Sequence, residues 1–214
     1  MQDLKILIVD DHQLMIDGYL SILQKLNYKL EVMTAHTFEE AKKRLDANIR
    51  FDLILLDRSL PSAKNRSNGD DLALLARQVL PDAKILMLTS HSEAFILYNI
   101  VHKVKPDALL VKCDFDGSEL LDAVEKVLGG GIYKSWTVQK VLKNITSRNG
   151  YLDNYNRQII MLLAQGIKTK NLSEHLPLSS SAIDKRKVLI KHYLEIEKGN
   201  DEDIIRVARN LGLV

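Results

Sequence analysis

The first 128 residues alternate short apolar runs with amphipathic segments five times. The apolar runs are rich in leucine and β-branched residues and are too short for helices, which predicts buried strands. These predicted strands cover residues 4–9, 29–34, 52–56, 83–88 and 107–111. The intervening segments repeat apolar residues at helical spacing and predict helices at 13–26, 38–46, 69–79, 92–103 and 117–128. Because parallel strands need crossover helices, the alternation predicts a (βα)5 doubly wound parallel sheet.

The rest of the chain has only helical patterns. The glycine run 129–131 ends the last helix of the sheet region, and a short helix is expected at 137–144. Further helices are predicted at 153–165, 168–175, 180–194 and 201–210. We therefore expect an α/β domain over 1–128, a linker over 129–150 and a small all-α domain over 151–214.

Charge is divided unevenly between these regions. Residues 1–128 carry 16 Lys and Arg against 20 Asp and Glu, a net charge of −4. Residues 129–214 carry 14 against 8, a net charge of +6. The basic second region suggests a polyanionic partner.

Composition excludes several classes of protein. A run of about 20 apolar residues, which a membrane span requires, is missing, and a secretory signal is not expected at the N-terminus. The single cysteine, Cys113, cannot form an internal disulfide, which favours a reducing, cytoplasmic location.

Carboxylates follow two of the predicted strands. Asp10 and Asp11 come after the first apolar run, and Asp57 closes the third. The carboxyl ends of parallel strands are where such sheets place functional groups, so three carboxylates are expected to converge there. Three converging negative charges need a cation among them, and Mg²⁺ prefers oxygen ligands. The turn after the first predicted strand, residues 10–13, lacks the glycines that bind phosphate in a dinucleotide site. The sequence therefore does not predict dinucleotide binding.

Two further strand ends complete the predicted site. Thr89 ends the fourth apolar run, and Lys112 follows the fifth. A nucleophilic carboxylate, a divalent cation, a hydroxyl donor and a lysine are what phosphoryl transfer onto aspartate requires. An aspartyl-phosphate hydrolase of the haloacid dehalogenase type would instead want its nucleophile and acid two residues apart after the first strand, and that spacing is absent.

Residues 1–128 resemble a two-component receiver domain, which has a flavodoxin-like fold. The matching motifs are Val9-Asp10-Asp11-His12, Leu55-Leu56-Asp57, Leu60-Pro61, Leu88-Thr89-Ser90 and Leu110-Val111-Lys112. The resemblance implies that Asp57 is the phosphoacceptor and that Asp10, Asp11 and Asp57 bind Mg²⁺. It also implies that Thr89 is the switch hydroxyl, that Lys112 pairs with the phosphoryl group, and that a sensor histidine kinase is the donor.

Two of the chain's departures from the receiver pattern are the loop after Pro61 and the residue at position 109. The interval from Pro61 to Gly69 is about four residues longer than usual, and this 62–68 loop could bring Lys64 or Arg66 near the phosphate. Leu109 stands where receivers usually have an aromatic residue that couples to phosphorylation.

The basic region resembles a LuxR-type output domain, with two short helices, a turn and a longer helix in the helix-turn-helix layout. Together the two resemblances are those of a NarL/FixJ-type response regulator. In the predicted recognition helix, Asp184 stands where the family commonly has lysine, and Lys187 takes a position that is usually aliphatic. On a 3.6-residue period, Ile183, Ile190 and Leu194 should face inward.

We expect the DNA contacts to come from this region. Base edges are assigned first to Lys185, and Asp184 could accept from a cytosine amine. Backbone phosphates are assigned to Lys168, Thr169, Lys170 and Ser180. The complete set of predicted DNA-binding residues is Lys168, Thr169, Lys170, Ser180, Ser181, Asp184, Lys185, Lys187 and Lys191.

The leading hypothesis is therefore a non-enzymatic response regulator that is phosphorylated on Asp57, binds double-stranded DNA and forms a homodimer on activation. The alternative is a receiver whose helical tail binds protein or RNA.

Overall fold

The computed structural model describes residues 2–47, 49–61, 68–147 and 152–214, and the chain forms two compact units. The first unit comprises Met1–His91 and Asn99–Gln139. The second comprises Ser92–Tyr98 and Lys140–Val214. Each unit has its own hydrophobic core.

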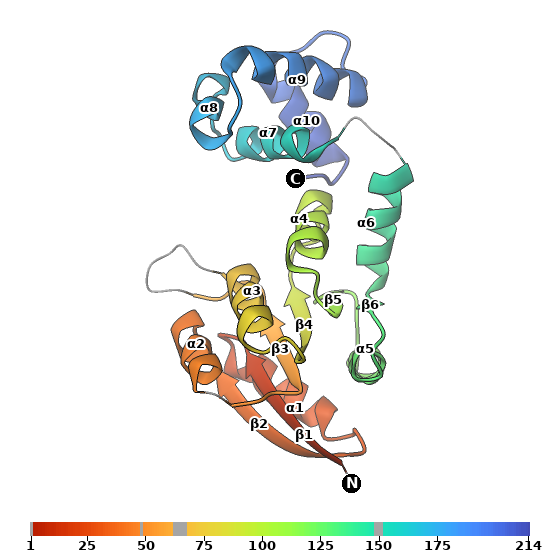
Figure 1. Cartoon of the computed structure of the whole chain (residues 1–214). Helices are drawn as coiled ribbons and strands as arrows, with labels where there is room; N and C mark the ends of the chain where they lie inside the picture. The colour runs from red at the N-terminus through yellow and green to blue at the C-terminus, as the bar shows by residue number, and fades with distance from the viewer. Residues whose placement is uncertain (1, 48, 62–67, 148–151) are drawn as a thin grey trace. The chain divides into compact units, whose positions relative to one another are not determined.

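The first unit is built on a six-stranded parallel sheet in the order β2-β1-β3-β4-β5-β6 (Figure 1). The strands are β1 (Gln2–Val9), β2 (Tyr28–Ala35), β3 (Leu53–Asp57), β4 (Lys84–Thr89), β5 (Ala108–Val111) and β6 (Tyr133–Lys134). Every residue of β3 and of β5 is buried, as strands covered on both faces should be. Edge strand β2 has only one buried residue, Ala35.

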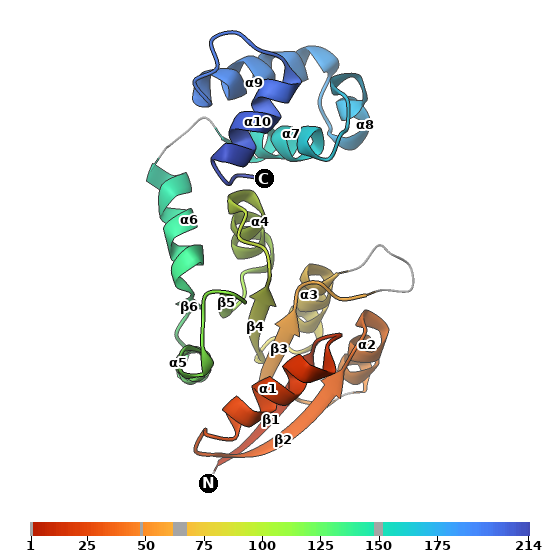
Figure 2. The same cartoon turned by 180° about the vertical axis from the view of Figure 1, so that it is seen from behind.

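Helices cover both faces of this sheet. The helices α1 (Gln13–Leu23) and α5 (Gly117–Leu128) pack on one face, and α2 (Phe38–Asp46) and α3 (Gly69–Val79) lie on the other, as the two opposite views show (Figures 1 and 2). Side chains alternate along β1, so that Leu4, Ile6 and Ile8 belong to the α1–α5 face. The helices α3 and α5 each begin with a capping box, set by Asn68 and Asp116.

The second unit is helical. Its helices are α7 (Asn154–Ala164), the short 3₁₀ helix η2 (Thr169–Asn171), α8 (Leu172–His175), α9 (Ser180–Tyr193) and α10 (Asp201–Asn210). The helix α6 (Trp136–Ser147) begins in the first unit and ends in the second. The three inward positions predicted on the recognition helix are confirmed, since Ile183, Ile190 and Leu194 are buried in this core.

The segment Ser92–Tyr98 also belongs to the core of the second unit. It contains most of α4 (Ala94–Asn99), whose Ala94 and Phe95 are buried with the apolar residues of α7, α9 and α10. The backbone amides of Ala94 and Phe95 donate to the carbonyls of Gly212 (3.0 Å) and Leu213 (3.2 Å). These bonds satisfy amides at the start of a helix, which have no partner within the helix itself.

The structure differs from the predicted elements in two places. The segment expected as one helix over 92–103 is the short α4 followed by a π-helix, η1 (Ile100–Val104), and it ends at Lys105 in the left-handed region with φ 52°. The two-residue strand β6 was not predicted. In the described ranges, no helix is both long and apolar enough to cross a bilayer.

Candidate functional site

Four neighbouring strands deliver the predicted site residues to one edge of the sheet. Asp10 follows β1, Asp57 ends β3, Thr89 ends β4 and Lys112 follows β5. These strands are consecutive in the sheet order, so the four residues converge although they span 102 positions of sequence between Asp10 and Lys112. Asp10, Asp57 and Thr89 are buried. Aspartates are seldom buried unless their charge has a partner, so the two carboxylates need one.

Lys112 is the partner of both buried carboxylates. Its Nζ lies 2.9 Å from Asp10 Oδ2 and 3.0 Å from Asp57 Oδ1. Burial alone would lower the pKa of Lys112, but its hydrogen bond to Asp10 and the negative charges of Asp57 and Asp10 raise it above its ordinary value. The ammonium therefore stays charged and holds the two negative groups together.

The two carboxylate oxygens of Asp57 differ in their hydrogen bonding. Its Oδ2 accepts from the backbone amide of Ser59 at 3.2 Å. Its Oδ1 is buried beside Lys112 at 3.0 Å, yet no described neighbour forms a well-directed hydrogen bond to it. Burial raises the pKa of Asp57, and the charge of Lys112 offsets only part of that increase. An anionic oxygen with unused lone pairs in a low-dielectric site can serve as a nucleophile or a metal ligand.

Thr89 presents an oriented hydroxyl. Its side chain is buried, and Oγ1 accepts from the amide of His91 at 3.1 Å. The Thr89 carbonyl accepts from the Lys112 amide at 2.7 Å, which ties the ends of β4 and β5 together. The hydroxyl can still donate its own proton to an incoming oxygen, because the bond from His91 uses only one of its two lone pairs.

A cluster of possible metal ligands lies beside these residues. One ligand atom from each of Asp10, Asp11 and His12 falls within 4.8 Å of the others. Asp10 Oδ1 accepts from the His12 amide at 2.9 Å, and His12 Nδ1 lies 2.8 Å from Asp11 Oδ1. His12 directly follows the aspartate pair, but no role was predicted for it from the sequence. The carboxylates of Asp10 and Asp11, together with that of Asp57, are the hard oxygen donors that Mg²⁺ prefers.

Arg58 and Asp70 form a clamp beside the site that sequence analysis did not find. Arg58 Nε and one terminal nitrogen donate to the two oxygens of Asp70 at 3.1 and 3.2 Å, a bidentate pair that is mostly buried. The amide of Gly69 donates to the Arg58 carbonyl at 2.9 Å. A Cβ on Gly69 would lie 2.5 Å from the Asp57 carbonyl oxygen, so only glycine fits here. In the sequence, only Gly69 at the start of the predicted helix 69–79 pointed to a close backbone contact here.

The structure describes Leu109 but not the two basic residues of the 62–68 loop. Leu109 is buried within β5 and packs in the sheet core. Lys64 and Arg66, predicted to approach the phosphate, lie outside the described residues.

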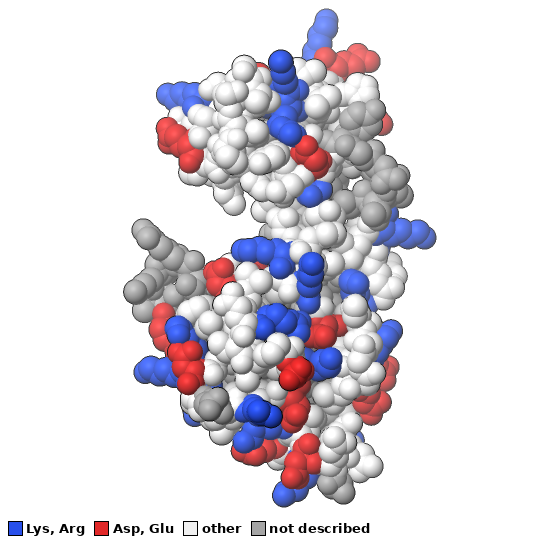
Figure 3. Space-filling view, viewed as in Figure 1, with Lys and Arg blue, Asp and Glu red and all other residues white. Residues whose placement is uncertain are grey.

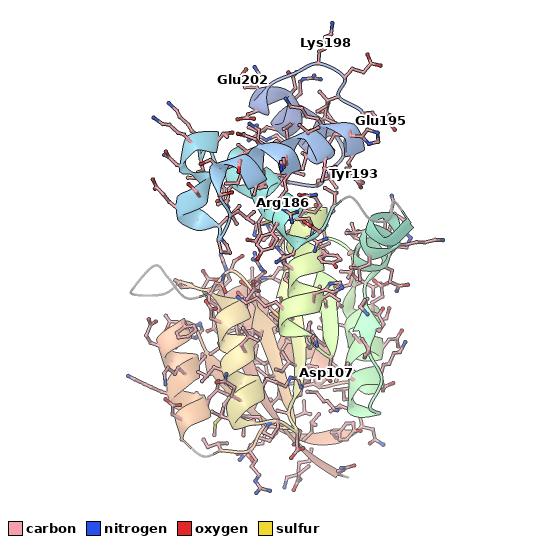
Figure 4. All side chains as sticks on the ribbon, turned by 45° about the horizontal axis from the view of Figure 1, so that its top comes forward. Asp107, Arg186, Tyr193, Glu195, Lys198 and Glu202 are labelled. Atoms are coloured by element: carbon pink, nitrogen blue, oxygen red, sulfur yellow. The ribbon has the colours of Figure 1, made fainter. Side chains whose placement is uncertain are left out.

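The second unit presents a helix-turn-helix arrangement, formed by η2, α8 and α9. Ser179 caps α9 by accepting from the Ala182 amide at 3.3 Å. Arg186 reaches from α9 to Asp153 and Asn156, which anchors the longer helix on the start of α7 (Figure 4). The exposed residues of α9 and its start include Ser180, Ser181, Asp184, Lys185, Val188 and Leu189.

The predicted DNA-contacting lysines have different environments. Lys168, Lys170 and Lys185 are exposed. Lys187 is instead largely buried, with Nζ 2.6 Å from Asp201 Oδ1 and 2.8 Å from Thr169 Oγ1. Lys191 donates to the Gly199 carbonyl at 2.6 Å. The face drawn in Figure 3 intersperses basic with acidic side chains.

A comparison with protein families identifies the first unit. Residues 6–125 match the family of the response regulator receiver domain, which is more than half of the chain. The matched range contains Asp10, Asp11, Asp57, Thr89 and Lys112.

Relatives match over nearly the whole chain. The transcriptional regulatory protein MctR of Rhizobium johnstonii is 26% identical over 214 residues, covering 99% of this chain and 95% of MctR. The response regulator UvrY of Escherichia coli is 25% identical, covering 98% and 95%. Among solved structures, RcsB of Salmonella typhimurium has a TM-score of 0.64 at 20% identity and covers 100% of both chains. RcsB bound to a promoter in the presence of the phosphomimetic BeF₃⁻ has a TM-score of 0.67 at 18% identity, covering 97% and 98%.

Proposed function

Because the chain belongs to the response regulator receiver family, in the NarL/FixJ-type arrangement, we propose that a sensor histidine kinase phosphorylates Asp57 and that the second unit then binds promoter DNA. The observation that carries this proposal is the shared lysine: one ammonium holds both buried carboxylates, and one of these has a buried oxygen without a hydrogen bond. The relatives named as transcriptional regulators support the regulatory half. The division into 1–128, 129–150 and 151–214 and a cytoplasmic location are parts of the same proposal.

The residues account for each requirement of the transfer. An Asp57 oxygen attacks the phosphorus of a phosphohistidine, the P–N bond breaks, and its electron pair leaves with the histidine. Lys112 lies beside the reacting oxygen, where it can neutralise charge on the phosphoryl group. Thr89 can donate its hydroxyl proton to another phosphoryl oxygen. Asp10, Asp11 and Asp57 would hold Mg²⁺, which when bound would neutralise further phosphoryl charge.

The exposed side of α9 is proposed to enter the major groove. Lys185 is assigned to a base edge, Asp184 to a cytosine amine, and Val188 offers the kind of apolar contact that a thymine methyl accepts. Lys168, Lys170 and Ser180 are exposed and are assigned to phosphates. Lys187 and Lys191 bind protein oxygens, so we assign them to holding the domain together.

Phosphorylation is tested by treating the full chain with acetyl phosphate and Mg²⁺ and measuring its intact mass. Wild type should gain one phosphoryl group, and Asp57→Ala should gain none. A wild-type chain that stays unmodified would show that the acidic site is not a phosphoacceptor.

The output half needs a separate measurement because a helical tail could bind protein or RNA instead. Phosphorylated protein should bind double-stranded promoter fragments with an affinity that falls steeply as salt increases. Lys185→Ala should weaken this binding, whereas Lys198→Ala, an exposed lysine outside α9 (Figure 4), should not. If neither the phosphorylated nor the unmodified protein binds duplex DNA at low salt, the protein or RNA alternative gains support.

A further inference from the structure

The start of helix α6 is fastened to the turn that follows β5. The backbone amide of Thr137, in the first turn of α6, donates to Asp114 Oδ2 at 2.8 Å. The Thr137 hydroxyl donates to the other carboxylate oxygen of Asp114, also at 2.8 Å. The first amides of a helix have no partner within the helix, so a carboxylate from elsewhere can satisfy them. Here the carboxylate comes from 23 positions earlier in the sequence, which makes this a tertiary contact and not a local cap.

Ser135 fixes the same junction from the side of the sheet. Its side chain is buried, and its hydroxyl accepts from the Val111 amide at 3.2 Å. The Ser135 amide donates to the Leu109 carbonyl at 3.1 Å, and the Ser135 carbonyl accepts from the Gln139 amide at 3.0 Å in the helical pattern. The residue before α6 is therefore bonded both to β5 and to α6, so the end of β5 and the start of α6 are joined.

The turn that presents Asp114 also carries Lys112. The Asp114 amide donates to the Val111 carbonyl at 2.9 Å, so the chain from Val111 to Asp114 forms one tight turn. Lys112 is the second residue of this turn, and its ammonium contacts the carboxylates of Asp10 and Asp57. The group that would pair with a phosphoryl group and the group that holds α6 are thus two residues apart on a single hydrogen-bonded turn.

Phosphorylation would change the partners of Lys112. With Mg²⁺ held by Asp10, Asp11 and Asp57, the Asp10 carboxylate no longer depends on Lys112 for its counter-charge, and the ammonium can pair with the phosphoryl oxygens. Because a phosphoryl group extends outward from the Asp57 oxygen to which it is bonded, the lysine must shift to follow it. The Lys112 side chain is mostly buried, so a shift of the ammonium is passed to the backbone of the turn.

We propose that Asp114 is a positioning residue that couples Lys112 to the start of α6. When the ammonium follows a phosphoryl group on Asp57, the turn moves, and the two hydrogen bonds from Thr137 make the first residues of α6 move with it. Because α6 begins in the first unit and ends in the second, its start is a place from which a change at the acidic site can be passed on. This role rests on the proposed phosphorylation of Asp57, whereas the first of its two tests does not require it.

The chain supplies its own reporter of this junction. Trp136 is the only tryptophan of the sequence, and it is the first residue of α6, next to Thr137. Its side chain is 64% exposed, so its fluorescence emission responds to a change in how the indole lies against its neighbours. The position of the start of α6 can therefore be followed in the full-length protein without a label.

The first test is a double-mutant cycle in the full-length chain without Mg²⁺. Lys112→Met should shift the emission of Trp136, because the turn is no longer held by the ammonium. In the Asp114→Ala background the same substitution should cause little or no shift, because the turn no longer holds α6. Circular dichroism checks that each protein is folded, and Lys112→Gln replaces Lys112→Met if that variant is not. Equal shifts in the two backgrounds, or no shift in either, overturn the inference.

The second test uses the phosphoryl mimic beryllofluoride with Mg²⁺. Binding is measured as a rise in melting temperature, and the response of α6 as a change in Trp136 emission. Wild type should show both, whereas Asp114→Ala should keep the rise in melting temperature and lose most of the change in emission. Thr137→Val removes only the hydroxyl bond and should lose part of the emission change, and Thr137→Ser, which keeps a hydroxyl, should lose none.

The matched control is Asp116→Ala, which removes the capping aspartate of the neighbouring helix α5. It should lower the stability of the first unit through the loss of that cap and yet keep the full emission change. If Asp116→Ala loses the response as Asp114→Ala does, the effect is one of stability and the inference is wrong.

Two other outcomes of the beryllofluoride experiment are decisive. Full emission change in Asp114→Ala, or a wild type that binds the mimic without any change at Trp136, would contradict the coupling. A wild type whose melting temperature does not rise would instead contradict the proposed phosphorylation of Asp57, and the cycle between Lys112 and Asp114 would still decide the role of Asp114.

Discussion

At the scale of single residues, the acidic site shows a conflict between stability and chemistry. Asp57 is 3% exposed and carries an oxygen without a hydrogen bond, an arrangement that burial makes unfavourable for the ionised form. The same features leave that oxygen available to react. The site residues themselves, except His12, were predictable because each ends or follows a recognisable apolar run. The Arg58–Asp70 clamp was not, because its two residues are 12 positions apart in sequence and only the fold brings them together.

This conflict predicts that Asp57→Asn will stabilise the protein without Mg²⁺. The pKa of Asp57 is higher in the folded state than in the unfolded state, where it is about 3.9. The free energy of unfolding therefore falls as pH rises from the unfolded pKa through the folded pKa, because the buried carboxylate becomes ionised. The variant should therefore gain about 1 kcal/mol of unfolding free energy at pH 7, and the gain should disappear below about pH 4. Urea unfolding across this pH range measures it, and a variant less stable than wild type at pH 7 would contradict it.

The pair between Lys187 and Asp201 gives the opposite pH dependence. Although burial alone would raise it, hydrogen bonds from Lys187 and Thr169 lower the pKa of Asp201. Its contribution to stability is therefore present above about pH 3.9, the unfolded value, and is lost as pH falls through the folded value. Asp201→Asn should cost about 1–2 kcal/mol at neutral pH and progressively less in acid, as measured by urea unfolding. A cost that does not change with pH would rule out this ion pair as the cause.

At the scale of helices and strands, the apolar runs predicted five strands to within two residues, because buried strands require such composition. The sixth, β6, is too short to have a pattern. It pairs with β5, and the amides of Tyr133 and Ser135 donate to the carbonyls of Asp107 (2.9 Å) and Leu109 (3.1 Å). The π-helix η1 was missed because it has the same apolar composition as an α-helix. Asp107 also accepts from Arg77 at 2.9 Å, a tertiary contact that no local pattern reveals (Figure 4).

Substitution of Gly69 at the start of α3 should affect stability very differently from substitution of Gly18 in α1. Gly69→Ala would place its Cβ 2.5 Å from the Asp57 carbonyl oxygen and 2.6 Å from Arg58 Cα, so the backbone at the phosphoacceptor must move. We expect a loss of about 1–3 kcal/mol and slower phosphorylation by acetyl phosphate. Gly18→Ala is the control: in α1 its Cβ meets nothing within 4 Å, and it should stabilise by about 0.5–1 kcal/mol. Similar effects from the two substitutions would contradict this account.

Recognition helix α9 predicts two separable lysine phenotypes. Lys185→Ala should weaken duplex binding by roughly 10-fold or more with little change in stability, because the side chain is exposed. Lys187→Ala should chiefly lower the stability of the second unit, because it removes the ammonium that pairs with the Asp201 carboxylate. Binding isotherms at fixed salt, together with melting curves, separate the two. The pairing of Lys187 was hidden from sequence because Asp201 lies on the next helix, although a lysine at a usually aliphatic position was a clue.

At the scale of the whole molecule, acidic and basic regions are joined in one chain, with net charges of −4 over 1–128 and +6 over 129–214. Such a chain should bind polyanions weakly unless a second copy doubles the basic surface. We therefore expect phosphorylation of Asp57 to increase both dimer formation and the salt sensitivity of DNA binding. Sedimentation velocity with and without acetyl phosphate measures the first of these, and Asp57→Ala should show no response. A monomer in both states would remove the dimer from the proposal.

The Arg58–Asp70 clamp also has a practical consequence for protein engineering. Two side-chain hydrogen bonds and the Gly69 amide close the chain on itself around the segment between β3 and α3. Because the closure fixes both ends, the number of residues between them affects mainly loop entropy, at about 0.6 kcal/mol for each doubling of length. A change in the number of residues between Pro61 and Asn68 should therefore cost little stability as long as Arg58, Gly69 and Asp70 are kept, because these three residues hold the two ends beside the phosphoacceptor.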